Sequence, residues 1–128
     1  MIVDTSAIMA ILLGEAEARS FVEAIVDAER CVISGGSWIE LSAVLVRRNH
    51  QLDDQLALLM ERGSIEIEPV TEVQARIGHA AYKRYGIGSG HAARLNFGDC
   101  FAYALAKATA EPLLYKGDDF AKTDIIAA

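Results

Sequence analysis

Short apolar runs alternate with longer helical segments along the chain, and this order most restricts the fold. Residues 1–3, 31–34 and 113–115 are brief and apolar, as is typical of buried strands. Residues 65–69 alternate as Ile-Glu-Ile-Glu-Pro, which indicates an edge strand with one solvated face. Because helical patterns separate these runs, the sequence predicts an α/β fold with a parallel sheet and helices on both faces.

The segments between the strands carry apolar residues at helical spacing, and polar or glycine residues mark their ends. Ser6 and Thr71 are the expected N-caps of two helices. Gly14 is expected to end the helix that Ser6 begins, and Gly63 to end the helix before the edge strand. Helices are expected over residues 6–13, 15–27, 37–49, 53–62, 71–85 and 99–109.

The third expected helix begins with a capping-box pattern. Gly35 and Gly36 are expected to form the turn before it, with Ser37 as N-cap and Glu40 as the acid of S-x-x-E. A cap and a metal ligand would both place Glu40 at the ligand edge of the sheet, so the pattern leaves both roles open. The side chains of this helix expected to face the core are Ile39, Leu41, Val44 and Leu45.

Length and composition indicate one folded domain over residues 1–128. The chain is 52% hydrophobic and 23% charged, a balance that allows a sizeable core and excludes general disorder. No run reaches the length of a membrane span, and no signal peptide is evident, because Asp4 precedes the first apolar stretch and no basic residue does. Cys31 and Cys100 lack metal-ligand spacing and are expected as buried thiols. We therefore expect a cytoplasmic protein.

The net charge of −6 argues against nucleic-acid binding, but the basic residues are unevenly placed. Residues 76–94 contain no acid, and Tyr82 and Tyr85 lie among their basic side chains. A second basic group consists of Arg47, Arg48 and His50. Two interpretations stay open for both groups, a solvated helix face and a surface that contacts phosphates, with a tyrosine stacking on an unpaired base.

Acidic residues stand where the strands end or the helices begin. These residues are Asp4, Glu40, Asp99 and the pair Asp118-Asp119. In a parallel sheet such positions share one edge, so we expect the carboxylates to converge. Two unit charges about 5 Å apart repel by roughly 3 kcal/mol at an effective dielectric near 20, so a proton or a cation must relieve them. All-oxygen ligands suit Mg²⁺ or Mn²⁺, and such a site favours phosphodiester hydrolysis.

Several common catalytic motifs are absent from the sequence. Gly86, Gly88 and Gly90 follow a helix and lack the G-x-G-x-x-G spacing, which excludes a dinucleotide fingerprint. The chain has no P-loop and no G-x-S-x-G elbow. The histidines show no zinc spacing and are expected at the surface: His50, His79 and His91. An aspartyl-phosphate enzyme is disfavoured because Ser6, not a second Asp, stands two residues after Asp4.

Four segments together resemble the PIN domain, and more closely the VapC toxins of bacterial toxin–antitoxin pairs. They are DTSA at residues 4–7, WIEL at 38–41, LNFGDCFAYALA at 95–106 and LLYKGDDF at 113–120. The last two are the specific ones, and the resemblance covers nearly the whole chain. It implies a PIN-like three-layer α/β/α domain over residues 1–128, with a central parallel sheet of four to five strands.

The resemblance also implies an activity, a cofactor and partners. The expected protein is a Mg²⁺- or Mn²⁺-dependent endoribonuclease, a homodimer that cleaves RNA and is inhibited by a small VapB-type antitoxin. By analogy the catalytic acids are Asp4, Glu40, Asp99 and Asp119, and the metal ligands are Asp4 and Asp99. Asp119 is preferred to Asp118 because the family's fourth acid directly precedes a Phe. Asp124 is either a further contact near the site or a local cap.

Two other functions stay open. One is a non-catalytic protein-binding module of the same fold whose acids serve as caps and as a partner surface, and the other is a DNA-directed metal-dependent nuclease on a related fold. The sequence does not specify the RNA target, the number of metal ions or the antitoxin surface. Apolar residues at 11–13 and 44–46 are a candidate for that surface, with ordinary core packing as the alternative.

Overall fold

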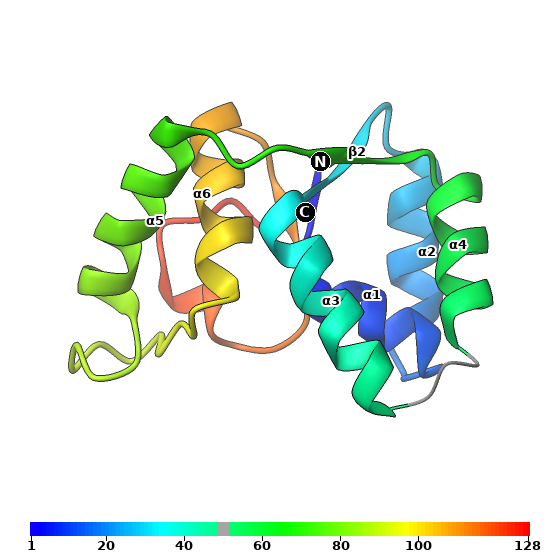
Figure 1. The fold of residues 1–128 in the computed structure, drawn as a ribbon, viewed down its shortest axis with the longest axis horizontal. Coiled ribbons are helices and arrows are strands. Elements are labelled where there is room, and N and C mark those ends of the chain that lie inside the picture. Colours follow the sequence, from blue (N-terminus) through cyan, green and yellow to red (C-terminus); the bar gives the residue numbers. More distant parts are fainter. Residues whose placement is uncertain (49–51) are drawn as a thin grey trace.

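The computed structural model describes residues 1–48 and 52–128, which are built around a four-stranded parallel sheet (Figure 1). The strands are β1 (Ile2–Val3), β2 (Cys31–Ser34), β3 (Ile65–Glu68) and β4 (Leu113–Leu114). Their order is β3-β2-β1-β4, and each neighbouring pair is parallel. The four predicted strands are confirmed, and β3 lies at the sheet edge as expected.

Helices connect the strands in the predicted alternation. They are α1 (Thr5–Leu12), α2 (Ala18–Asp27), α3 (Gly35–Arg48), α4 (Asp53–Arg62), α5 (Glu72–Tyr85) and α6 (Asp99–Thr109), followed by the short η2 (Phe120–Lys122). The predicted end of the third helix at Asn49, and His50 of the second basic group, lie outside the described residues. None of the helices within the described ranges is long and apolar enough to cross a membrane.

Helices cover both faces of the sheet, because successive side chains of each strand point to opposite faces. Ile2, Val32 and Leu113 belong to one apolar cluster, together with side chains of α5 and α6. Val3 and Ile33 belong to the other cluster, with side chains of α1, α2, α3 and α4. Figure 1 shows α5 and α6 together on one side and α1, α2 and α4 together on the other. The expected three-layer α/β/α architecture is confirmed.

Three predicted helix starts were wrong. The helix expected from residue 15 begins at Ala18, and the other two corrections concern residues near the sheet edge. Asp4, not Ser6, is the N-cap of α1, because its extended backbone lets its side chain accept from the Ser6 N–H. Gly35 and Gly36 form the first residues of α3, not a turn before it. A Cβ on Gly36 would lie 2.3 Å from the Phe101 ring, so this glycine serves the close approach of α3 to α6.

The core face of α3 is narrower than predicted. Leu41 and Leu45 are fully buried, but Ile39 is 71% exposed. Since residues advance about 100° around a helix, Ile39 lies roughly 200° from Leu41 and points away from the core. Val44 is half-buried at the margin of this face.

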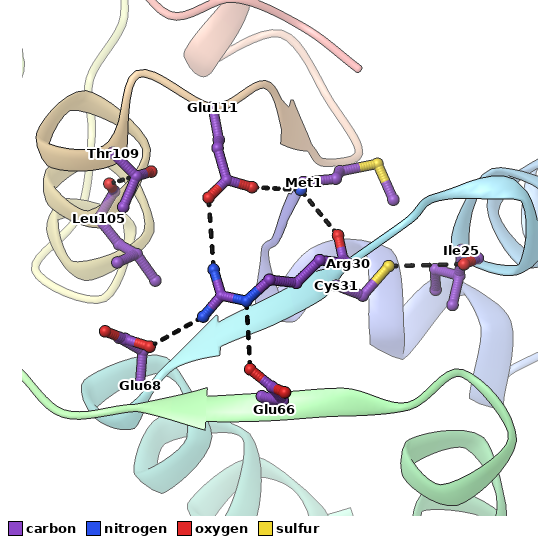
Figure 2. Close-up of polar contacts among 9 residues, drawn as sticks. All are labelled: Met1, Ile25, Arg30, Cys31, Glu66, Glu68, Leu105, Thr109 and Glu111. Atoms are coloured by element: carbon purple, nitrogen blue, oxygen red, sulfur yellow. Dashed lines mark hydrogen bonds and ion pairs between the residues drawn. The ribbon is translucent and has the colours of Figure 1, made fainter.

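One exposed arginine connects three segments of the sheet. The guanidinium of Arg30, just before β2, donates to Glu66 and Glu68 of β3, each at 3.2 Å, and to Glu111 at 3.4 Å (Figure 2). The N-terminal amine of Met1 pairs with the same Glu111 and donates to the Arg30 carbonyl at 2.8 Å. These ion pairs are largely solvent-exposed and contribute modestly, but they place two cationic groups among three glutamates beside the segments that precede β1, β2 and β4.

The buried face of α3 gives a direct test of the core. We expect Leu41→Ala to lower the free energy of unfolding by about 2–5 kcal/mol, because the lost contacts leave a cavity. Leu58→Ala, on the 45% exposed Leu58 of α4, is the matched control and should cost less than about 1 kcal/mol. Urea denaturation measures both, and equal losses would contradict the assigned core.

Candidate active site

Asp4 is held at the carboxyl end of β1 by a short chain of hydrogen bonds. Its Oδ2 accepts from the Ser6 N–H at 2.9 Å and from the Ser6 hydroxyl at 2.5 Å. The Ser6 Oγ in turn accepts from the backbone N–H of Lys116, just after β4, at 3.0 Å. Burial raises the pKa of Asp4, and the Ser6 hydrogen bonds oppose this only in part. The carboxylate is therefore fixed between β1 and β4.

Glu40 reaches this edge from α3. Its Oε2 accepts from the Thr5 hydroxyl at 3.3 Å, next to Asp4. Its carboxylate also lies against Gly98, where an added Cβ would be 2.1 Å from the Glu40 Oε1. Burial, and then the charge of Asp4, raise the pKa of Glu40. Only glycine at position 98 leaves room for this carboxylate beside the start of α6.

The capping-box interpretation of Glu40 was wrong. Because α3 already begins at Gly35, Ser37 lies inside the helix and is not its N-cap. The Ser37 Oγ is buried and has no hydrogen-bond partner among the described residues. Glu40 thus has no capping role with Ser37, and its carboxylate faces Thr5 and Gly98 instead.

Asp99 begins α6 and exchanges hydrogen bonds with Asn96. The Asp99 carboxylate accepts from the Asn96 N–H at 2.7 Å, and the Asn96 side-chain oxygen accepts from the Asp99 N–H at 3.0 Å. This reciprocal N-x-x-D pair resembles a capping box and fixes the position of Asp99; it was not predicted from the sequence, although its spacing was readable. Burial is the main cause that raises the pKa of Asp99 to about 7, and the charges of Asp4, Asp119 and Glu40 add to it.

The fourth acid lies in the exposed segment after β4. Asp119 directly precedes the buried Phe120, whose ring packs 5.1 Å from that of Tyr115. The charge of Asp119 raises the pKa of Asp99, whereas Asp118 is not among the groups that do so. The charges of Asp4, Glu40 and Asp119 thus all act on Asp99, and Asp119 is the member of the Asp118-Asp119 pair that does so.

Asp124 belongs to a different contact. It accepts from the Tyr103 hydroxyl at 2.6 Å and from the Lys107 ammonium at 3.1 Å. Both partners lie on α6, so Asp124 fastens the C-terminal segment to that helix. These contacts support a structural role for Asp124 and not a role beside the acid group.

The acid group suits a hard cation but does not form a closed cage. Within residues 1–48 and 52–128, no three His, Cys, Asp or Glu side chains are arranged so that they alone would hold a metal ion. The donor set at the site is entirely carboxylate, which matches Mg²⁺ or Mn²⁺ and neither zinc nor copper chemistry. Burial raises the pKa values of Asp4, Glu40 and Asp99, so a neighbouring positive charge would favour their ionised forms.

Some side chains of the basic segment at residues 76–94 are buried in the core, and others are exposed at the surface. Tyr85 is buried and packs edge-on against His91 at 4.9 Å, so its predicted role in base stacking was wrong. Tyr82 is 42% exposed and remains available. His79 is exposed as expected, whereas His91 is half-buried and accepts from the Ala93 N–H. The thiols of Cys31 and Cys100 are both buried and free, as predicted.

Comparison with known proteins identifies relatives over nearly the whole chain. The sequence profile of the PIN domain matches residues 1–126. Ribonuclease VapC28 of Mycobacterium tuberculosis is 48% identical over 126 residues, which cover 98% of this chain and 95% of that protein.

Solved structures agree on the fold. Mycobacterium tuberculosis VapC20, described as a sarcin-ricin loop cleaving toxin, gives a TM-score of 0.73 at 19% identity and covers 99% of this chain and 97% of its own. A chain of a toxin–antitoxin complex from Klebsiella pneumoniae gives a TM-score of 0.72 at 20% identity. The match covers 99% of this chain and 95% of that one.

The acid group predicts an unusual pH dependence of stability without metal. Because folding raises the pKa of Asp99 from 3.8 to about 7, its stabilising protonated form is lost as pH rises through that window. Asp99→Asn removes this charge and keeps an acceptor for Asn96. After a discount for the partial exposure of Asp99, we expect it to stabilise the metal-free protein by about 1–2 kcal/mol above pH 7.

The control for this measurement is Asp118→Asn, on an exposed side chain outside the group that acts on Asp99. Thermal unfolding in EDTA at several pH values compares the two variants with the parent protein. If Asp118→Asn raised the thermal stability more than Asp99→Asn, the destabilising repulsion would not be centred on Asp99.

Proposed function

Because this chain belongs to the VapC ribonucleases of the PIN-domain family, we propose that it is the toxin of a toxin–antitoxin pair, an endoribonuclease that hydrolyses RNA phosphodiester bonds. The proposed catalytic domain spans residues 1–128. One observation carries the chemistry: Asp4, Glu40 and Asp119 all act on the charge of Asp99 at one edge of the sheet. Capping accounts for Asp4 alone and not for the gathering of four acids, whose mutual repulsion destabilises the metal-free protein.

PIN-domain ribonucleases depend on a divalent metal ion, and we propose Mg²⁺ or Mn²⁺ here, with Asp4 and Asp99 as its protein ligands. When bound, such an ion polarises the phosphoryl oxygens and makes a coordinated water more acidic. Two ligands leave most positions to water and substrate, as Mg²⁺ prefers. The fixed position of Asp4 on Ser6, and of Asp99 on Asn96, supports this pairing.

Glu40 and Asp119 have the remaining roles in the proposal. Glu40 accepts from Thr5 and has a raised pKa, which suits a carboxylate that orients the attacking water and accepts its proton. Asp119 completes the acid group from the exposed segment after β4. Exposed Lys83 and Arg84 of α5 are the proposed contacts to the RNA backbone.

The proposed setting follows from the relatives. A toxin–antitoxin complex is among the structural neighbours, and we propose that a VapB-type antitoxin binds this chain and inhibits it. We further propose a homodimer in the cytoplasm. Light scattering on purified protein tests the dimer, and co-purification with the product of an adjacent small gene tests the antitoxin.

The central test replaces Asp4. We expect Asp4→Asn to reduce RNA cleavage by roughly 100-fold or more, because the charge at the acid site is lost. The fold should persist, since an asparagine oxygen can still accept from the Ser6 N–H and cap α1. Cleavage of total RNA with Mn²⁺, with an EDTA control, measures the loss. Full activity in this variant would remove Asp4 from the site.

The neighbouring aspartates allow a matched comparison. Asp119→Asn should reduce cleavage by about tenfold or more, whereas Asp118→Asn should stay within about twofold of the parent, because only Asp119 acts on Asp99. Both residues are exposed, so neither change should disturb the fold. The reverse order of the two activities would assign the fourth acid to Asp118.

A further inference from the structure

A mainly apolar groove of about 350 Å³ lies between α5 and α6. Tyr82 contributes to its α5 side, and Phe97 and Phe101 contribute to its other side. Cys100 and Phe101 also line it and directly follow Asp99 in the first turn of α6. The groove therefore reaches the first turn of α6, the helix that Asp99 begins.

A buried amide lines the same groove. Gln74 is only 5% exposed, and its Oε1 has no hydrogen-bond partner within the part of the chain that the structure describes. Leaving a buried acceptor without a donor is unfavourable, and such groups are rare in folded proteins. An amide carries a donor beside an acceptor, which matches the edge of a nucleobase that places an N–H beside a ring nitrogen or carbonyl.

The walls of the groove present aromatic rings to solvent. Phe97 is 74% exposed and packs edge-on against Phe101 with ring centroids 5.0 Å apart. Tyr82 is partly exposed on the facing helix. Exposed aromatic rings are the usual stacking partners of unpaired bases in single-stranded RNA. Lys83 and Arg84 follow Tyr82 on the exposed surface of α5 and complement the phosphates of such a strand.

We propose that this groove binds one unpaired nucleobase of the RNA, adjacent to the phosphate that is cleaved. The base lies between Tyr82 and Phe97, and its hydrogen-bonding edge faces the Gln74 amide. This inference rests on the proposed ribonuclease function and adds a specificity site to it. The groove thereby selects which unpaired nucleotide is presented to the acids.

Uncharged nucleosides test the base site without metal or cleavage. Adenosine, cytidine and uridine are titrated into the full chain in EDTA, and saturation-transfer NMR reports which ligand protons touch the protein. We expect base protons to receive more saturation than ribose protons, and ribose 5-phosphate not to bind. Because no bond is cleaved, this result is independent of the Asp4→Asn activity test.

Two tryptophan variants on α5 form a matched pair. Ala75 is exposed and lines the groove, so Ala75→Trp should fill it and weaken nucleoside binding by about tenfold. Ala80 is exposed on the same helix and does not line the groove, so Ala80→Trp should leave binding unchanged. Gln74→Leu should weaken binding by about threefold or more without loss of stability, because it also removes the unpaired acceptor.

Nucleoside binding that survives Ala75→Trp, or saturation confined to ribose protons, would overturn the proposal. Sedimentation of the parent protein, Ala75→Trp and Ala80→Trp tests whether a second copy of the chain, and not a nucleobase, occupies the groove. If the parent is a dimer and Ala75→Trp is a monomer while Ala80→Trp stays dimeric, a second copy covers the groove and the base site is rejected. Equal sedimentation of all three proteins, together with lost nucleoside binding in Ala75→Trp alone, supports the base site.

Discussion

Mutual repulsion among carboxylates at one edge of the sheet is the constraint on which the rest of the site depends. Parallel strands bring Asp4 and the segment after β4 to the same edge, and α3 and α6 add Glu40 and Asp99. The fold therefore concentrates negative charge where its own packing gains nothing from it. The cost shows in Asp99, whose pKa burial and three neighbouring acids raise to about 7. A site of this kind is stable only with protons or with a cation, which links the stability of the fold to its chemistry.

The same residues position the acids and start the helices. Asp4 caps α1 while it faces the site, and Asp99 exchanges hydrogen bonds with Asn96 while it begins α6. Local secondary structure thus sets the orientation of each carboxylate, and little additional scaffolding is needed. Gly36 and Gly98 then let α3 approach α6 closely enough for Glu40 to join the group.

The sequence was sufficient for the parallel α/β fold, the four strands and the approximate extents of the helices, because these follow from periodicity and from segments of a known family. It was insufficient where two local patterns competed. Ser37 and Glu40 fit a capping box, yet Gly35 starts the helix earlier, and Ile39 then turns outward. Burial of Tyr85, and the free acceptor of Gln74, depend on how α5 packs on α6. Side-chain contacts between helices distant in sequence leave no local signal, so such features were missed.

The Arg30 cluster sets its end of the sheet apart from the end that holds the acid group. Its guanidinium and the Met1 amine meet three glutamates, so this part of the sheet supplies its own counter-charge, unlike the acid group (Figure 2). The segments that precede β1, β2 and β4 therefore need no added ion. At the other end of the same strands, the acid group gains from a bound cation, so the two ends of the sheet should respond differently to chelation.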